Sequence, residues 1–173
     1  MRDSDIRSAG ARDIAAITRI YAEAVENSTA TFEIKRPDEA EMARRQNALL
    51  GNGFPYFVAL REGKVAGYAY AGPYHTRPGY RWTVEDTVYV DPQFHRQGLG
   101  RLLMSRVVAE AEARGFRQML AVIGGSGHAS IALHTAVGFR QVGTLQSVGF
   151  KHGRWIDVVL MQRALGNADS TTP

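Results

Sequence analysis

The sequence predicts one α/β (α+β) domain built around a mostly antiparallel mixed sheet, and three observations lead to this fold class. The 173 residues are enough for a single core. Hydrophobic residues make up 45% of the chain, and their spacing changes between strand-like and helix-like along it. The resulting element order is β-α-α-β-β-β-α-β-α-β-β, which is typical of a sheet flanked by helices. We assign residues 1–165 to this domain and expect the polar tail, residues 166–173, to be disordered.

The first half of the chain predicts a strand, two helices and a hairpin. The first helix is indicated by apolar residues that recur on one face, and the second by Pro37 and acidic residues at its start. Two apolar runs separated by a short turn are typical of a hairpin. The predicted elements are a strand at 6–9, helices at 14–24 and 37–51, and a hairpin at 56–72 that turns at Glu62-Gly63.

The second half alternates strands and helices before it ends in a strand pair. The long helix is indicated by Leu99, Leu103 and Val107 on one face, and Gly115 ends it. The predicted elements are a strand at 83–90, a helix at 99–114, a buried strand at 117–123, a short helix at 129–138 and two strands within 139–162.

Composition excludes several classes of protein. The absence of cysteine rules out disulfides, thiolate metal sites and a cysteine nucleophile. His75, His128 and His152 do not have the spacing of metal ligands, so we expect no metal. No signal-peptide-like or membrane-spanning segment is visible, so we expect a cytoplasmic protein without a membrane partner. The net charge of +4 comes from scattered basic residues, which favours a solvated surface over a nucleic-acid partner.

The segment HRQGLG places two glycines where the chain changes from strand to helix. Glycine costs helix stability, but Gly98 and Gly100 also remove the Cβ atoms that would keep a ligand from the unpaired amides of the first turn. Arg96 and Arg101 add positive charge, so the segment is a candidate phosphate cradle; the alternative is a turn with no ligand. A dinucleotide fingerprint would need glycine at Leu103, and the Gly-Lys-Ser/Thr of a P-loop is also absent. A different pyrophosphate-carrying cofactor is therefore indicated.

This segment, within VYVDPQFHRQGLGRLLM, resembles the acyl-CoA-binding motif of the GNAT acetyltransferase superfamily. AYAGPYHTRPGYRWTVEDTVYV, LAVIGG, SIALHTAVGF and VGFKHGRWIDVVLMQR resemble the phosphinothricin acetyltransferase family within it. The resemblance implies the GNAT fold and acetyl-CoA as co-substrate. Two positions depart from it, because His95 stands where Gln or Arg is usual and Gly127 where many relatives have an Asn near the pantetheine arm. The residues it implies for co-substrate binding are Val88, Tyr89, Val90, His95, Arg96, Gln97, Gly98, Leu99, Gly100 and Arg101.

Acetyl transfer to an amine needs a base, a donor for the oxyanion and help for the leaving thiolate. The period of two in TVEDTVYV puts Glu85 on a face with Thr83 and Tyr89, which by pattern alone could be a solvated sheet face. The resemblance identifies Glu85 as the base, with Asp86 on the opposite face the weaker candidate. We expect the oxyanion donor to be the amide of Tyr89 or a close neighbour, freed by a bulge.

His134 matches a histidine of the narrower family. It could protonate the thiolate or assist removal of the amine proton, or it could be a structural histidine. The sequence leaves both roles open.

The loop PYHTRPGYRW points to the amine substrate. Its Arg77 and Tyr80 match positions that surround an acidic amino acid in the family, and a guanidinium can bind a carboxylate or phosphinate through two hydrogen bonds. The implied substrate is phosphinothricin, or methionine sulfoximine or sulfone; His75 leaves that choice open because relatives differ there. The implied substrate-binding residues are Phe32, His75, Arg77, Tyr80, Thr83 and Arg96, with Arg81 assisting.

Two other functions remain open at this point. One is acetylation of a different amine, such as a protein N-terminus, and the other is a non-catalytic sensor that binds CoA. The resemblance also implies a homodimer, because members of the family pair.

Overall fold

The structure is a computed structural model that describes residues 6–125 and 127–172. Four α-helices and seven strands lie in these ranges, with short 3-10 helices at Ala11–Asp13, Pro78–Tyr80 and Pro92–Phe94. The helices are α1 (Ile14–Asn27), α2 (Glu39–Gly51), α3 (Leu99–Ala113) and α4 (His128–Ala136). The strands are β1 (Ile6–Ser8), β2 (Tyr56–Arg61), β3 (Lys64–Pro73), β4 (Thr83–Val90), β5 (Gln118–Gly124), β6 (Arg140–Lys151) and β7 (Arg154–Ala164).

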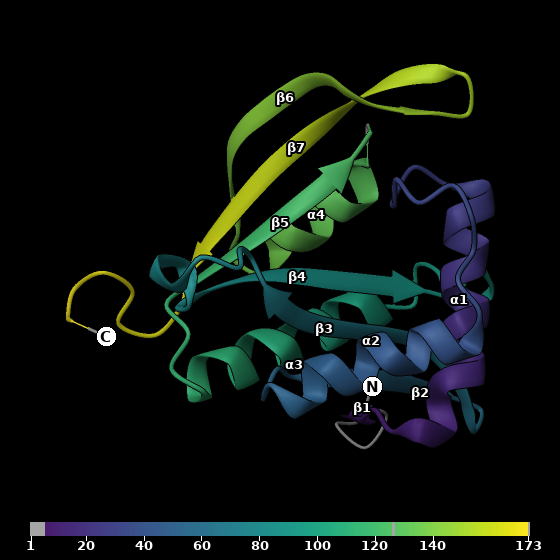
Figure 1. Cartoon of the computed structure of the whole chain (residues 1–173), viewed down its shortest axis with the longest axis horizontal. Helices are drawn as coiled ribbons and strands as arrows, with labels where there is room; N and C mark the ends of the chain where they lie inside the picture. The colour runs from purple at the N-terminus through teal and green to yellow at the C-terminus, as the bar shows by residue number, and fades with distance from the viewer. Residues whose placement is uncertain (1–5, 126, 173) are drawn as a thin grey trace.

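The strands form one mixed sheet in the order β1-β2-β3-β4-β5-β7-β6 (Figure 1). Only β4 and β5 are parallel, and every other neighbouring pair is antiparallel. This confirms the predicted fold class. The position of β7 between β5 and β6 is the one step in the sheet order that departs from sequential neighbours.

Two turns show how local chemistry sets the element boundaries. The Asp38 side chain accepts a hydrogen bond from the Glu41 amide at 2.8 Å, which caps the N-terminus of α2. Glu62 and Gly63 both have positive φ, 50° and 74°, as a two-residue type I′ hairpin turn requires. The hairpin turn predicted at these two residues is confirmed.

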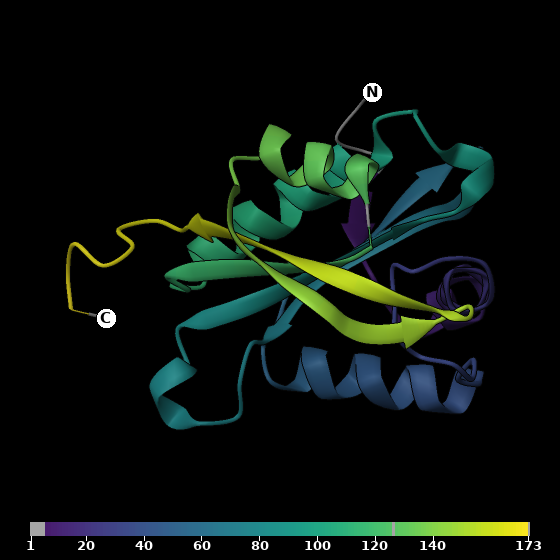
Figure 2. The ribbon, with the colours of Figure 1, turned by 90° about the horizontal axis from the view of Figure 1, so that it is seen from above.

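The helices cover both faces of the sheet and form two cores. Figure 2 shows α3 and α4 on one side of the sheet and α2 on the other. On the α3 side Leu103 and Val107 are fully buried, and Val84 of β4 joins them. On the α1 side the core includes Ile17, with Tyr89 of β4 packed against it. The predicted two-residue alternation of β4 is therefore what places its side chains on opposite faces.

β4 and β5 separate soon after they meet. Their pairing covers only Thr83–Glu85 against Gln118–Leu120. Beyond it β4 continues beside β3 to Val90, while β5 continues beside β7 to Gly124. Figure 1 shows the two strands diverging toward their C-terminal ends. The divergence opens the middle of the sheet.

The C-terminal tail, whose disorder is a prediction from its polar composition, is contacted by Arg117. Residues 166–169 form turns, and the Arg117 side chain donates hydrogen bonds to the Ala168 carbonyl and to Thr171 Oγ1. Leu165, just before the tail, is fully buried, and its amide bonds to the Arg117 carbonyl at 2.9 Å. These contacts connect the end of the domain and the start of the tail to Arg117. Pro173 lies outside the described residues.

Candidate active site

A cavity of about 980 Å³ occupies the opening between β4 and β5 and extends to the N-terminal ends of α3 and α4. The predicted residues that do not line it are His75, Arg77, Tyr80, Thr83 and Gln97. The predicted residues that do line it are Phe32, Glu85, Val88, Tyr89, Val90, His95, Arg96, Gly98, Leu99, Gly100, Arg101 and His134.

Gly98, before α3, and Gly100, within it, lack a side chain for different structural reasons. Gly98 is the N-cap and adopts a left-handed conformation with φ 79°, which disfavours a side chain. Gly100 has an ordinary φ, but a Cβ there would lie 3.2 Å from Leu133 Cδ2 of α4. The Leu102 amide donates to the carbonyl of the N-cap Gly98 at 3.2 Å, so the amides before Leu102 have no acceptor within the helix. They face the cavity with Arg96 and Arg101, an arrangement that fits a pyrophosphate.

The segment that leads into this cradle is held by Asp91. Its amide donates to the Ala66 carbonyl at 2.9 Å, and its side chain accepts from Arg19 at 2.6 Å and from the Gln93 amide at 3.0 Å. Burial raises the pKa of Asp91, but these two donors outweigh it and lower the pKa overall. Asp91 therefore stays ionised and fixes the turn that carries the glycines.

Glu85 is half-buried and lines the cavity near the point where β4 and β5 part. Burial raises the pKa of its carboxyl, and the negative charge of Asp86 raises it further. A carboxylate with a raised pKa in a cavity has the properties of a proton acceptor.

Behind Glu85 lies a buried pair between Asp86 and His134. His134 Nε2 is 2.9 Å from Asp86 Oδ2, and Nδ1 is 2.7 Å from the Ser130 carbonyl. Because a carbonyl only accepts, we assign the proton on Nδ1 to that bond. Both ring nitrogens are thus engaged with the protein, and the histidine is 2% exposed.

The protonation of this pair follows from its burial. Burial lowers the pKa of His134, but the hydrogen bond and charge of Asp86 raise it by more. Burial also raises the pKa of Asp86, and His134 offsets only part of that rise. The pair therefore holds a proton between Nε2 and Oδ2 more tightly than a free histidine would.

Asp86 is a site residue that the sequence reasoning set aside. As predicted, Asp86 lies on the face of β4 opposite Glu85. Its partner, His134, comes from α4, 48 residues further along the chain. The available signal was a charged residue within an apolar series, between Val84 and Val88. A buried carboxylate at such a position needs a partner.

The β4 amides that face the opening belong to the close neighbours of Tyr89 rather than to Tyr89 itself. At the two ends of the β3–β4 ladder, the carbonyl of Thr83 and the amide of Asp91 bond to the β3 chain. Alternation along an antiparallel ladder then directs the amide of Tyr89 to β3 and the amides of Val88 and Val90 to the β5 side. The β3–β4 register contains no bulge, so the divergence from β5, rather than a bulge, leaves these neighbours facing the opening.

The predicted substrate loop between β3 and β4 forms an aromatic cluster of its own. The ring of Tyr80 lies 5.1 Å from that of His75 and 5.6 Å from that of Tyr74. Arg81 lies over the Trp82 ring. Arg77 is exposed.

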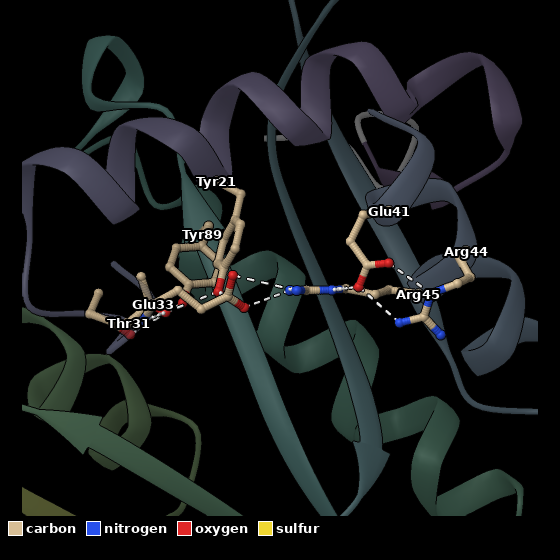
Figure 3. A network of polar contacts seen from close by, with 8 residues as sticks. Tyr21, Thr31, Glu33, Glu41, Arg44, Arg45 and Tyr89 are labelled. Atoms are coloured by element: carbon tan, nitrogen blue, oxygen red, sulfur yellow. Dashed lines mark hydrogen bonds and ion pairs between the residues drawn. The ribbon is translucent and has the colours of Figure 1, made fainter. Parts of the chain in front are cut away.

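The wall of the cavity on the α1 side is the loop Ser28–Glu33. Tyr21 bonds to Thr31 Oγ1 and to Glu33, each at 2.9 Å, and Arg45 reaches Glu33 at 2.6 Å (Figure 3). Burial raises the pKa of Tyr21 to about 12, so its hydroxyl keeps its proton. This network fixes the loop to α1 and α2.

Within the described ranges, no group of three or more His, Cys, Asp or Glu side chains could hold a metal ion. No helix in these ranges is long and apolar enough to cross a membrane.

The fold and the cavity define a class of enzyme. The profile of the Acetyltransferase (GNAT) family matches residues 17–139, and the chain belongs to this family of N-acetyltransferases. The resemblance read from the sequence is confirmed.

Three similar proteins carry names that specify their substrates. The chain is 51% identical to phosphinothricin N-acetyltransferase of Alcaligenes faecalis over 162 residues, which cover 93% of this chain and 82% of that protein. It is 39% identical to L-methionine sulfoximine/L-methionine sulfone acetyltransferase of Salmonella typhimurium over 160 residues, 92% of this chain and 94% of that one. A crystal structure of a phosphinothricin acetyltransferase from Sinorhizobium meliloti in complex with AcCoA superposes with a TM-score of 0.96. It is 50% identical and the match covers 97% of this chain and 91% of that one.

Proposed function

We propose that this protein transfers the acetyl group of acetyl-CoA to the amino group of a small amino-acid-like substrate, phosphinothricin or methionine sulfoximine or sulfone. The observation that carries the proposal is that the glycine cradle and the Glu85 carboxylate open into one cavity. The similarity to enzymes with these substrates supports the choice of amine.

The cradle is proposed to hold the pyrophosphate of the co-substrate. The free amides at the start of α3 point at the anion, and Arg96 and Arg101 add charge. The thioester would then lie in the opening beside β4, where the amides of Val88 and Val90 face the β5 side.

Glu85 is proposed as the general base. It accepts a proton from the substrate ammonium, and the freed nitrogen attacks the thioester carbon. The new C–N bond forms first, and the amide of Val88 or Val90 stabilises the resulting tetrahedral oxyanion. The nitrogen then loses its second proton to solvent, and the C–S bond breaks as the carbonyl forms again. The raised pKa brings Glu85 closer to the pH at which it works.

His134 is proposed as the acid that returns a proton to the departing thiolate. Its raised pKa keeps a proton on Nε2, and its ring lines the cavity. Because Nε2 is bonded to Asp86 Oδ2 and Nδ1 to the Ser130 carbonyl, this step requires the Nε2 proton to leave Asp86. A kcat–pH profile distinguishes this role from a structural one. We expect an alkaline limb in the wild type that is missing from His134→Gln, whereas a structural role would leave the limb in place.

For the amine we propose Arg77, an exposed residue of the β3–β4 loop that does not itself line the cavity, as the anchor of a substrate carboxylate or phosphinate that extends beyond the cavity. Phe32, His75, Tyr80, Thr83 and Arg96 complete the substrate site. Arg77→Lys keeps the charge but loses the paired hydrogen bonds. We expect a higher KM for the amine and an unchanged KM for acetyl-CoA.

We also propose a homodimer that forms through the β6–β7 hairpin. β6 is an edge strand, and Val148, Phe150 and Trp155 on the hairpin are 55%, 56% and 66% exposed. An exposed apolar patch on an edge strand favours association. Light scattering should show a dimer that Trp155→Glu converts to monomer, while Leu50→Glu, at the end of α2, leaves it intact.

The decisive experiment measures thiol release from acetyl-CoA with a panel of amines. We expect turnover with phosphinothricin or methionine sulfoximine, and a large loss of kcat in Glu85→Gln with acetyl-CoA affinity retained. Turnover only with peptide N-termini would favour the alternative acetyltransferase, and binding of acetyl-CoA without any turnover would favour a sensor. Bacteria that express the protein should tolerate phosphinothricin if it is a substrate.

A further inference from the structure

The loop Ser28–Glu33 is held from the far side by the β6–β7 hairpin. Lys151 Nζ at the end of β6 donates to the Thr31 carbonyl at 2.8 Å. Lys151 is only 3% exposed, and burying an ammonium group is costly unless it is hydrogen-bonded. From β4, the Tyr89 hydroxyl donates to the Ala30 carbonyl at 3.2 Å. Two strands that are distant in sequence thus fix the backbone on either side of this stretch.

The side chain of Phe32 in this loop packs against the backbone of two glycine residues. A Cβ added to Gly149 of β6 would lie 2.5 Å from Cζ and 2.7 Å from Cδ1 of the Phe32 ring, closer than carbon atoms can approach. A Cβ added to Gly124 at the end of β5 would lie 3.3 Å from Cε2 of the same ring. The ring therefore fits against β6 because Gly149 has no side chain, whereas at Gly124 the Thr29 carbonyl lies nearer to the Cβ position than the ring does.

The backbone does not require glycine at position 149. Gly149 pairs with Ile156 in the β6–β7 ladder, and its φ lies outside the left-handed region that favours glycine. Gly125, in contrast, has φ 72°. An alanine at 149 is compatible with the strand, so the Phe32 ring alone excludes it.

We propose that Gly149 is a positioning residue for amine specificity, because its lack of a side chain seats Phe32 as the wall of the amine pocket. Phe32 and Gly124 line the cavity and Gly149 does not, so Gly149 acts through the ring. The inference rests on the proposed acetyltransferase function. The cradle at Gly98 and Gly100 belongs to other elements, and the nearest neighbours of a Cβ at Gly100 are Leu133 and Val90 rather than this ring.

Gly149→Ala tests the proposal, with Gly143→Ala as the matched control. Gly143 lies on the same strand, and a Cβ there meets nothing within 4 Å. We expect Gly149→Ala to raise the KM of the preferred amine about tenfold, the size of effect that a small change in a pocket produces. The KM of acetyl-CoA and the parameters of Gly143→Ala should stay at wild-type values. Equal behaviour of the two variants would overturn the proposal.

A Phe32→Ala background separates action through the ring from other effects. If Gly149 acts through Phe32, Gly149→Ala adds nothing in that background. A tenfold rise in KM that persists there would refute the mechanism. If Gly149→Ala alone does not fold, the double variant should fold, because the overlapping ring is gone, and failure of both would also refute it.

The role of Gly149 in seating Phe32 can be tested separately from the proposed function. A wild type that acetylates no amine rejects the proposed function. A crystal structure of Gly149→Ala still shows whether Phe32 has left its position against Gly124, and a ring that has not moved rejects the structural basis of the inference.

Discussion

Replacing Asp86 by alanine removes one partner of the buried pair with His134. If the imidazole kept its charge, a stranded buried ion would cost about 3–5 kcal/mol. His134 can instead lose its proton, because burial alone lowers its pKa. The loss is then one charge-assisted hydrogen bond, about 2–3 kcal/mol. For a protein of this size that lowers Tm by about 4–12 °C.

Asp86→Asn is the matched variant. Its amide can donate to Nε2 of a neutral His134 while Nδ1 keeps its bond to the Ser130 carbonyl, so we expect a loss of about 1 kcal/mol, or about 2–4 °C in Tm. Folding raises the pKa of His134, so its protonation stabilises the native state below its ordinary pKa. That contribution is lost as the pH rises through the raised value. The Tm difference between the wild type and Asp86→Ala should therefore be larger at mildly acidic than at alkaline pH.

Catalysis gives a second readout of the same pair. The charge of Asp86 raises the pKa of Glu85, so Asp86→Asn should move the acid limb of the kcat–pH profile to lower pH. Thermal denaturation and steady-state kinetics measure the two effects separately. Equal losses of Tm in the alanine and asparagine variants, together with an unmoved acid limb, would show that Asp86 only fills space.

Three further predictions test other parts of the structure. Because Glu85 must be ionised to accept a proton, wild-type kcat should rise as the pH increases through the raised pKa of Glu85. Stopped assays at fixed ionic strength measure this profile, and a kcat that does not change with pH would contradict the prediction. Gly100→Val should weaken acetyl-CoA binding in calorimetry, since its Cβ would crowd Leu133, while Gly79→Ala, with nothing within 4 Å, serves as control. Asp13→Asn should cost about 2 kcal/mol, because Arg7 bonds to both Asp13 oxygens at 2.6 and 2.7 Å. Those bonds lower the pKa of Asp13, so the stability is present above its ordinary pKa and lost as pH falls through the lowered value. The difference in Tm from wild type should vanish there.

Local pattern was sufficient where the physics is local. The strand Thr83–Val90 has the predicted bounds, because alternation of apolar and polar residues over eight positions leaves little freedom. The glycine cradle was also predictable, since helix starts and positive φ have sequence signatures. The family resemblance then supplied roles that spacing could not.

Pairings between distant segments were beyond the sequence. Lys151 meets the Thr31 carbonyl across 120 residues, and Asp86 meets His134 across 48. Neither contact has a local signature. The direction of the β4 amides also could not be predicted, because it depends on the register with β3. A difference of one residue separates Tyr89 from Val88 and Val90, the proposed oxyanion donors.

The two faces of β6 have different surroundings. Gly149 and Lys151 contact the loop Ser28–Glu33, while the neighbouring Val148 and Phe150 are exposed to solvent. A change in packing on the outer face of β6 can therefore reach Phe32 through this one strand. If the proposed homodimer forms through this hairpin, subunit pairing and choice of amine are coupled, and diluting the protein to monomers changes which amines it prefers before it changes its affinity for acetyl-CoA.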